Sequence, residues 1–295
     1  MALVAAIAVG VLAAVPDFAE SAVPTSQWYW ALTVASSNSN VLLLGTGQGL
    51  YRSNDGGRYW KVTGPAGLDA TSIVQSGSKI FAAGVLQKAH ALPTVSTHGE
   101  YLVGKGKPVF VESTDDGTSW SRLVPKGLPA IAVQALAVDP GHDQTVYAVL
   151  RNGAVYRSTD SAASFQLWAG KIGGTPWALA ITVGGHFVAG NMTTGAYQSA
   201  NGASWLHTAF TDPRGSHMVM EYAVQPTDTN HVLMTSYGVL SSTDGGTTWQ
   251  PSLKSKVMFG PVAFSPGTPT LAYAVGWDHS LWRTDDAGGT WTQVG

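Results

Sequence analysis

Acidic and amide side chains recur along this 295-residue chain in six short clusters of one design. Each cluster has a Ser or Thr two residues before the acid or amide, then a turn, then an aromatic residue; the first runs from Ser53 to Trp60. The acid or amide positions are Asp55, Asp115, Asp160, Asn201, Asp244 and Asp286. The third copy lacks the glycine and ends in Phe165, and the fourth is one residue shorter and carries the amide.

The spacing within a cluster predicts a hairpin turn that is held by its own side chains. An Asp side chain accepts hydrogen bonds from backbone N–H groups across a turn. Glycine supplies the positive φ that the turn needs, and the aromatic residue covers the hairpin with apolar surface. We therefore expect these six residues to be structural, and we assign none of them to catalysis.

Glycoside hydrolysis is the catalytic chemistry that the other acids could support. It needs two carboxylates across a cleft, about 5–5.5 Å apart for retention and about 6.5–9.5 Å apart for inversion. The acids outside the clusters that fall near the expected working surface are Asp69, Glu100, Asp212, Glu221 and Asp278. No spacing singles out a pair among them, so the sequence predicts no catalytic residue.

An insertion at residues 86–107 is the most conspicuous candidate for contact with a partner. Long loops of this kind are functional or flexible, and a solvated hairpin without a partner is the alternative. Its candidate contact residues are Lys88, His90, His98, Glu100 and Tyr101. Two histidines without a third ligand at a recognised spacing do not make a metal site. We therefore predict no metal and no cofactor.

Other candidate binding residues fall on loops that we expect at the same surface. They are Arg151, Asp212, Arg214, Trp277, Asp278 and His279. Residues 212–215 are also explained as a simple turn with a local ion pair. Five tryptophans fall on inner strands or on these loops, where aromatic side chains suit a protein interface or a sugar. They are Trp28, Trp30, Trp168, Trp177 and Trp277, and packing in the core is the alternative for most of them.

The clusters sit in longer units that repeat along most of the chain. Their closing aromatic residues are 60, 45, 40, 44 and 42 residues apart, and the insertion explains the longest interval. Each unit contains four strand-like runs, and four strands in about 40–45 residues is the period of a propeller blade. The sequence predicts an all-β propeller with six four-stranded blades, at about 25–63, 69–123, 130–168, 175–208, 216–252 and 256–295. Seven blades are the alternative count, and a sandwich of hairpins does not explain six copies at one period.

The Ser-x-Asp-x-Gly-x-Thr-Trp pattern resembles the Asp-box, or BNR, repeat family of β-propellers over about residues 25–295. The resemblance is nearest in type to photosystem II stability/assembly factor-like, sialidase-like and sortilin-like propellers. It implies the fold and leaves the function open, because the family mixes enzymes with binding proteins. Sialidases bind a sugar carboxylate with three arginines, whereas here only Arg151 and Arg214 are expected on the working surface. The resemblance therefore disfavours sialidase activity.

Composition and the N-terminus bear on partners and location. Charged residues make up 12% of the chain and the net charge is −2, so no basic surface for nucleic acid is expected. There is no cysteine. Residues 1–22 begin with an apolar run without charge, which predicts a signal peptide or an N-terminal membrane anchor. Residues 23–295 would then be the propeller, in the periplasm, a lumen or outside the cell.

These observations favour a non-catalytic, extracytoplasmic propeller. Its expected role is that of a protein-binding scaffold, assembly factor or accessory subunit of a membrane-associated complex. A glycoside hydrolase or a carbohydrate-binding propeller is the alternative. In both cases the working surface is expected opposite the Asp-box turns.

Overall fold

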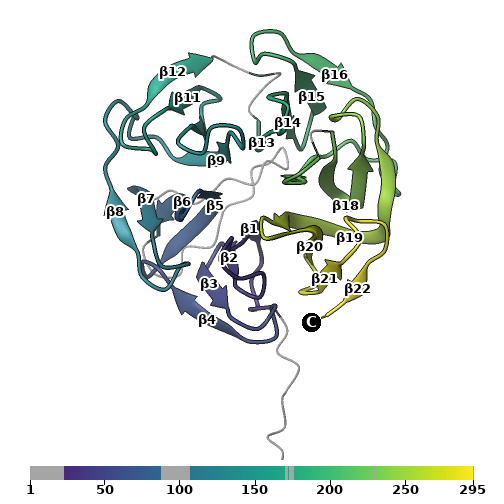
Figure 1. Cartoon of the computed structure of the whole chain (residues 1–295), viewed down its shortest axis with the longest axis horizontal. Coiled ribbons are helices and arrows are strands. Elements are labelled where there is room, and N and C mark those ends of the chain that lie inside the picture. Colours follow the sequence, from purple (N-terminus) through teal and green to yellow (C-terminus); the bar gives the residue numbers. More distant parts are fainter. Residues whose placement is uncertain (1–22, 88–106, 170–171, 173–175, 229, 295) are drawn as a thin grey trace, which may run out of the picture.

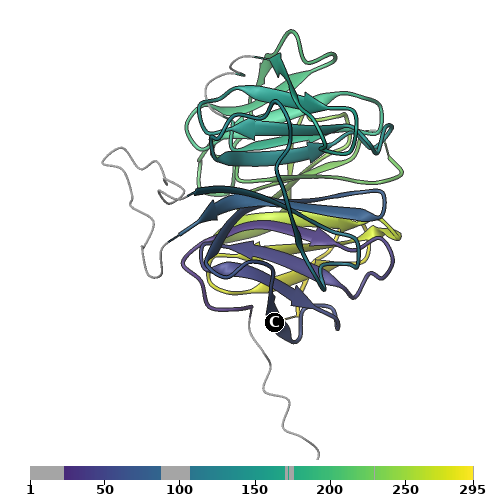
Figure 2. The same ribbon diagram turned by 90° about the vertical axis from the view of Figure 1, so that its left-hand side faces the viewer.

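The computed structural model describes residues 23–87, 107–169, 172, 176–228 and 230–294. Within these residues every regular element is a β-strand, and the strands form sheets set around a central axis (Figure 1). Figure 2 shows the same ring from its edge. The expected all-β propeller is confirmed. The described part of the chain contains no helix long and apolar enough to cross a membrane.

Four of the sheets are four-stranded meanders in chain order. The first sheet contains β1 (Tyr29–Val34), β2 (Leu42–Thr46), β3 (Gly49–Ser53) and β4 (Trp60–Thr63). The second contains β5 (Leu68–Ser76), β6 (Lys79–Leu86), β7 (Lys107–Ser113) and β8 (Ser121–Leu123). The third contains β9 (Val133–Val138), β10 (Val146–Leu150), β11 (Val155–Ser158) and β12 (Gln166–Ala169). The fourth contains β13 (Ala178–Ile181), β14 (Phe187–Asn191), β15 (Gly195–Ser199) and β16 (Leu206–Thr208).

The fifth sheet has six strands, and it corrects the expectation of separate blades at 216–252 and 256–295. Its strands are β17 (Tyr222–Val224), β18 (Val232–Ser242), β19 (Gln250–Ser265), β20 (Thr268–Gly276), β21 (Leu281–Thr284) and β22 (Thr292–Gln293). The sheet is continuous because β19 pairs with β18 through its first part and with β20 through its second. Four of the expected blades are therefore separate sheets, and the described residues show neither six nor seven separate ones.

Burial falls from the axis of the ring to its rim. All six residues of β1 and all five of β2 are buried, whereas two of the four residues of the outermost strand β4 are exposed. The inner strands are apolar because both of their faces are covered by protein. Large apolar side chains pack mainly between neighbouring sheets: Phe110 of β7 and Leu136 of β9 belong to one such cluster. The cohesion of the ring therefore comes from side-chain packing between sheets.

Each Asp-box turn is braced by its own residues. In the first box the Ser53 hydroxyl donates to Asp55 Oδ1 over 2.8 Å, and the N–H of Tyr59 donates to the same oxygen over 2.9 Å. The same pair of bonds recurs at the other Asp boxes, and in the fourth box Asn201 Oδ1 accepts from Ala203 N over 2.9 Å. The box oxygens are thus engaged within their own hairpins.

The Asp-box turns lie at the same end of the ring as the turns that follow the first strands. Gly56 N donates to Asn40 O over 2.9 Å, which joins the first box to the turn between β1 and β2. The fifth box is joined in the same way, through Gly245 N and Asn230 O. Because the strands of each meander alternate in direction, the turns between second and third strands lie at the opposite end.

Candidate functional site

The candidate residues of the long insertion cannot be placed. Lys88, His90, His98, Glu100 and Tyr101 lie outside the described residues. The flanking strands β6 and β7 pair from Ile80 with Ser113 to Leu86 with Lys107, so the insertion leaves and re-enters the second sheet at adjacent positions. It therefore starts from the end of the ring opposite the Asp boxes.

Tryptophans from three sheets meet at that same end. Trp28 stacks on Trp30 with ring centroids 5.7 Å apart, and Trp277 lies edge-on to Trp28 at 5.1 Å. Trp177 approaches Trp30 at 6.0 Å. Trp30 is the second residue of β1, and Trp177 immediately precedes β13, which lies across the ring from β1 (Figure 1). This tryptophan cluster (Trp28, Trp30, Trp177 and Trp277) thus spans the axis of the ring.

A buried acid fixes one member of the tryptophan cluster. Asp69, at the start of β5, is 1% exposed. Its Oδ1 accepts from Trp30 Nε1 over 2.9 Å, and its Oδ2 accepts from Gln87 Nε2 over 2.7 Å. A buried carboxylate needs such donors, because removing it from water without them is costly. Asp69 therefore orients both Trp30 and Gln87, which directly follows β6.

Asp212 and Arg214 do not pair through their side chains as a local ion pair would. Asp212 is 4% exposed and accepts from Arg214 N and Ser216 N over 2.8 Å each. Its other oxygen accepts from Ser236 Oγ over 2.6 Å and from Tyr237 N over 3.3 Å. The Arg214 guanidinium lies 4.6 Å above the Tyr237 ring, at an exposed position. Asp212 therefore connects the segment after β16 to the turn within β18, and the exposed Arg214 guanidinium also donates to Lys256 O over 3.4 Å.

Trp277, Asp278 and His279 form the turn between β20 and β21. Asp278 Oδ1 accepts from Ser280 Oγ over 2.6 Å. His279 has a positive φ of 69°, and its Nδ1 lies 2.5 Å from Tyr29 Oη. Because the Tyr29 hydroxyl donates its one hydrogen to Pro24 O over 2.8 Å, the His279 Nδ1–H is the donor to Tyr29. This turn therefore docks the residues that precede β1.

The remaining candidates are more dispersed. Arg151 begins the turn between β10 and β11, where its N–H donates to Ala132 O over 2.9 Å. Trp168 packs between the third and fourth sheets, at 5.0 Å from Tyr147 and 5.1 Å from Phe187. Within the described residues no group of three or more His, Asp or Glu side chains is placed to hold a metal.

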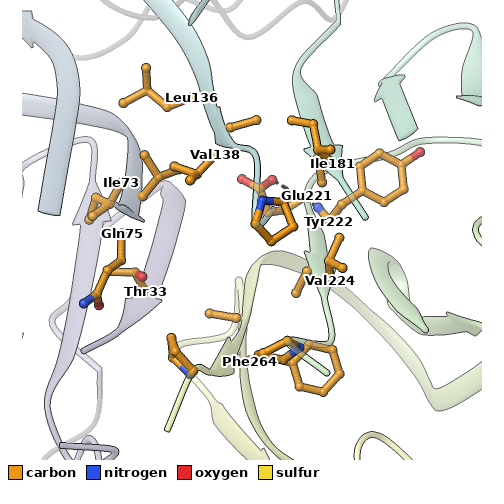
Figure 3. Close-up of a pocket in the computed structure, with 18 of the residues that line it drawn as sticks. Thr33, Ile73, Gln75, Leu136, Val138, Ile181, Glu221, Tyr222, Val224 and Phe264 are labelled. Carbon is orange, nitrogen blue, oxygen red and sulfur yellow. Dashed lines mark hydrogen bonds between the residues drawn. The ribbon is translucent and has the colours of Figure 1, made fainter. Parts of the chain in front are cut away.

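A cavity of about 330 Å³ occupies the central channel and was not anticipated from the sequence. It is lined by residues of β1, β5, β9, β13, β17 and β19, such as Thr33, Ile73 and Val224 (Figure 3). The turns that follow these strands also line it, through Gly77, Pro140 and Pro266 among others. Its mouth therefore lies at the Asp-box end. Glu221, which appeared in the sequence only as an unassigned acid, lies on its wall (Figure 3).

The family model of the Photosynthesis system II assembly factor YCF48 matches residues 13–295. This chain belongs to the YCF48 assembly-factor family. The Asp-box resemblance, with the photosystem II assembly factor among its nearest types, is thereby confirmed. No curated protein sequence matches the chain.

Solved structures share the fold of this YCF48-family chain at low sequence identity. A structure described as YCF48 bound to D1 peptide is 18% identical, with a TM-score of 0.54 over 92% of this chain and 82% of that one. YCF48 from Cyanidioschyzon merolae is 17% identical, with a TM-score of 0.51 over 92% and 86%. A GH74 xyloglucanase from Xanthomonas campestris is 15% identical, with a TM-score of 0.56 over 93% of this chain but 46% of the enzyme.

Proposed function

We propose that this chain is a non-catalytic propeller that binds a protein partner and serves as an assembly factor or accessory subunit of a membrane-associated complex. The observation that carries this proposal is the YCF48 family match over residues 13–295. A similar propeller has been solved with a D1 peptide, which supports peptide binding as the mode of contact.

We place the contact surface at the end of the ring that carries the tryptophan cluster. Trp28, Trp177 and Trp277 are partly exposed there. Arg214 is exposed in the connection between β16 and β17. Aromatic and arginine side chains are enriched at the energetic centres of protein interfaces. The strands β6 and β7, which flank the insertion, end and begin at this same end of the ring.

The test is binding of the D1 peptide of the solved complex, together with co-purification from membranes of the source cells. We expect Trp28→Ala and Arg214→Ala to weaken peptide binding about tenfold or more, in line with interface hot spots. Tyr59→Ala and Arg122→Ala are the matched controls, because both residues are exposed on outer strands or box turns. Wild-type protein that binds neither the peptide nor any membrane complex would refute the proposal.

A glycoside hydrolase is the weaker candidate. The xyloglucanase likeness reflects the shared fold, at 15% identity. Asp69 and Asp212 are buried and committed to hydrogen bonds within the protein. Carbohydrate binding by the tryptophan cluster would appear as quenching of tryptophan fluorescence by xyloglucan fragments, and we expect none.

We also propose that the ring counts as six blades, with two of them merged in the six-stranded sheet. β18 folds back on itself, since His231 Nε2 lies 3.0 Å from Ser241 Oγ while a straight strand of that length would span about 35 Å. β19 pairs with β18 through its first part and with β20 through its second. The sheet therefore holds two Asp boxes, at Asp244 and Asp286. An experimental structure with a different number of radial units would overturn this count.

Export belongs to the same proposal and rests on the apolar run in residues 1–22. A fusion of residues 1–22 to alkaline phosphatase, which is active only outside the cytoplasm, tests it. Activity in intact cells is the expected result. An inactive fusion that accumulates in the cytoplasm would remove the extracytoplasmic part of the proposal and leave partner binding standing.

A further inference from the structure

The central cavity combines apolar walls with very few ionisable groups. Its walls include Ile73 of β5, Val138 of β9, Ile181 of β13 and Phe264 of β19 (Figure 3). At about 330 Å³ it reaches the lower end of the size range of small-molecule sites, which are mostly apolar with a few placed polar groups. Such a site selects its ligand through those few polar groups.

The charges around this cavity are all acidic or neutral. Its ionisable lining residues are Glu221, Tyr222 and Asp143, and β1, β5, β9, β13 and β19 contribute apolar or uncharged lining residues such as Thr33 and Gln75. Tyr222 faces away from the cavity, because its hydroxyl donates over 3.1 Å to Ala189 O of β14 in the neighbouring fourth sheet. Asp143 is exposed at the mouth. The described lining therefore contains two carboxyl groups and no Lys, Arg or His.

Glu221 is held by its backbone and presents its carboxyl group to the cavity. Its carbonyl accepts from Thr235 N over 3.0 Å, and its Oε1 accepts from Tyr222 N over 3.0 Å. Within the described residues these contacts include no cation that would balance the carboxylate. The Glu221 side chain is partly accessible from the cavity, but desolvation by the surrounding protein raises its pKa to about 8, which favours the neutral acid at pH 7 in the absence of a ligand.

We propose that the channel cavity binds a small aliphatic ammonium ion, with the Glu221 carboxylate as counter-ion and the apolar walls enclosing the alkyl chain. The Glu221 carboxylate would gain a cationic partner, which none of its contacts among the described residues supplies, and the lining offers no Lys, Arg or His to an anion. This site is distinct from the surface that we propose for protein binding, at the other end of the ring.

At a pH below the pKa of the Glu221 carboxyl group in the ligand-free protein, binding of the ammonium ion must release a proton. The neutral Glu221 carboxyl loses its proton to solvent and the ligand keeps its own, which leaves a carboxylate–ammonium pair. Affinity should therefore rise by about tenfold per pH unit up to about pH 8 and level off above it. Each added methylene on the ligand should improve affinity by about fourfold through apolar burial.

The test is calorimetric titration of the full chain with n-butylamine and n-hexylamine at pH 6.5, in two buffers that differ in ionisation enthalpy. We expect saturable binding of one amine, release of close to one proton, and tighter binding of the hexyl chain. n-Hexanol and hexanoate have the same chain length without the positive charge, and each should bind at least tenfold more weakly. Equal binding of amine and alcohol, or no binding of the amine, would overturn the proposal.

Variants separate the carboxyl group from the cavity. Glu221→Gln keeps the shape, and it should abolish proton release and weaken amine binding at least tenfold. Ala180→Phe leaves the Glu221 carboxyl group in the sequence but adds bulk to the cavity wall from β13, and it should also block binding. Asp143→Asn is the matched control at the mouth and should change affinity less than threefold. Unchanged binding in Glu221→Gln would refute the assignment, and none of these results bears on D1-peptide binding.

Discussion

At the residue scale the defining feature is the closed set of hydrogen bonds within each Asp box. Asp244 Oδ1 accepts from the Ser242 hydroxyl and from the backbone of Thr247 and Thr248, and its Oδ2 accepts from the Thr248 hydroxyl. In the fourth box the Asn201 amide takes the place of the carboxylate, and its Oδ1 accepts from two backbone N–H groups. The carbonyl-type oxygen, more than the charge, is what the turn requires.

Asp244→Asn should therefore cost less than Asp244→Ala. We expect a loss of about 1 kcal/mol in the free energy of unfolding for Ala, after allowance for water competing at this exposed turn, and about half of that or less for Asn. Urea unfolding at pH 7 measures both. Equal losses for the two variants would show that the charge itself holds the turn.

Acid should weaken the boxes before it affects the rest of the ring. Hydrogen bonds from the Ser119 hydroxyl and N–H hold the pKa of Asp115 at about 2, and those from Thr290 and Thr284 do the same for Asp286. The pKa of Asp in an unfolded chain is about 3.9, so the folded carboxylates bind protons less readily than the unfolded ones. Their stabilising effect is complete above about pH 4 and is lost as the pH falls toward about 2.

The urea midpoint should therefore decline between about pH 4 and about pH 2. Asp115→Asn should make this decline shallower, because it removes one of the two carboxylates with a pKa of about 2. A midpoint that does not depend on pH in this range would contradict the assignment.

At the element scale, single buried side chains join segments that the sequence leaves unrelated. Asp212 connects the segment after β16 to the turn within β18 through four donors. Its sequence, Asp-Pro-Arg-Gly, predicts a turn with a local ion pair, and the turn is present. The bonds to Ser236 and Tyr237 could not be predicted, because they depend on how the neighbouring strands are placed.

Asp212→Ala should cost about 3 kcal/mol of unfolding free energy, since it leaves buried donors without a charged acceptor. Asp228→Ala is the control, because Asp228 caps an exposed turn by accepting from Asn230 N. The difference would appear in thermal or urea unfolding. A loss below about 1 kcal/mol for Asp212→Ala would mean that water replaces the carboxylate.

At the scale of the whole molecule, the ring closes through side chains. The first sheet and the sheet that ends in β22 share no strand. Leu42 and Leu44 of β2 instead pack in one cluster with Tyr273 and Leu281 of the last sheet. The approach is close enough that a Cβ at Gly57 would lie 2.2 Å from Leu281 Cδ2. A glycine in this box is thus needed for packing as well as for the turn.

Leu281→Ala should lower the unfolding free energy by about 2–5 kcal/mol, as expected for a fully buried leucine. Leu150→Ala, which removes an equally buried leucine between the second and third sheets, is the matched variant. Hydrogen exchange should quicken in β2 and β20 for the first and in β6 and β10 for the second. Identical exchange patterns in the two variants would show that the contact between the last and first sheets and the contact between the second and third sheets are not independent.

The repeat and its hairpins were predictable because they depend on residues only a few positions apart. The merging of the last two units was not, since β19 continues through Lys254 and Lys256, where the sequence indicates a loop between blades. The approach of Trp30 to Trp177 and the apolar surroundings of Glu221 depend on the diameter of the ring. Such features arise from closure, and no local pattern encodes them.

Trp30 and Trp177 approach each other at the end of the ring opposite the Asp boxes, whereas the turns that line the central cavity lie at the Asp-box end. We therefore expect a ligand of this cavity to enter and leave past the turns at the Asp-box end. A partner protein bound over the Asp-box end would then slow exchange of the cavity ligand, whereas a partner bound over the tryptophan cluster would leave exchange unaffected.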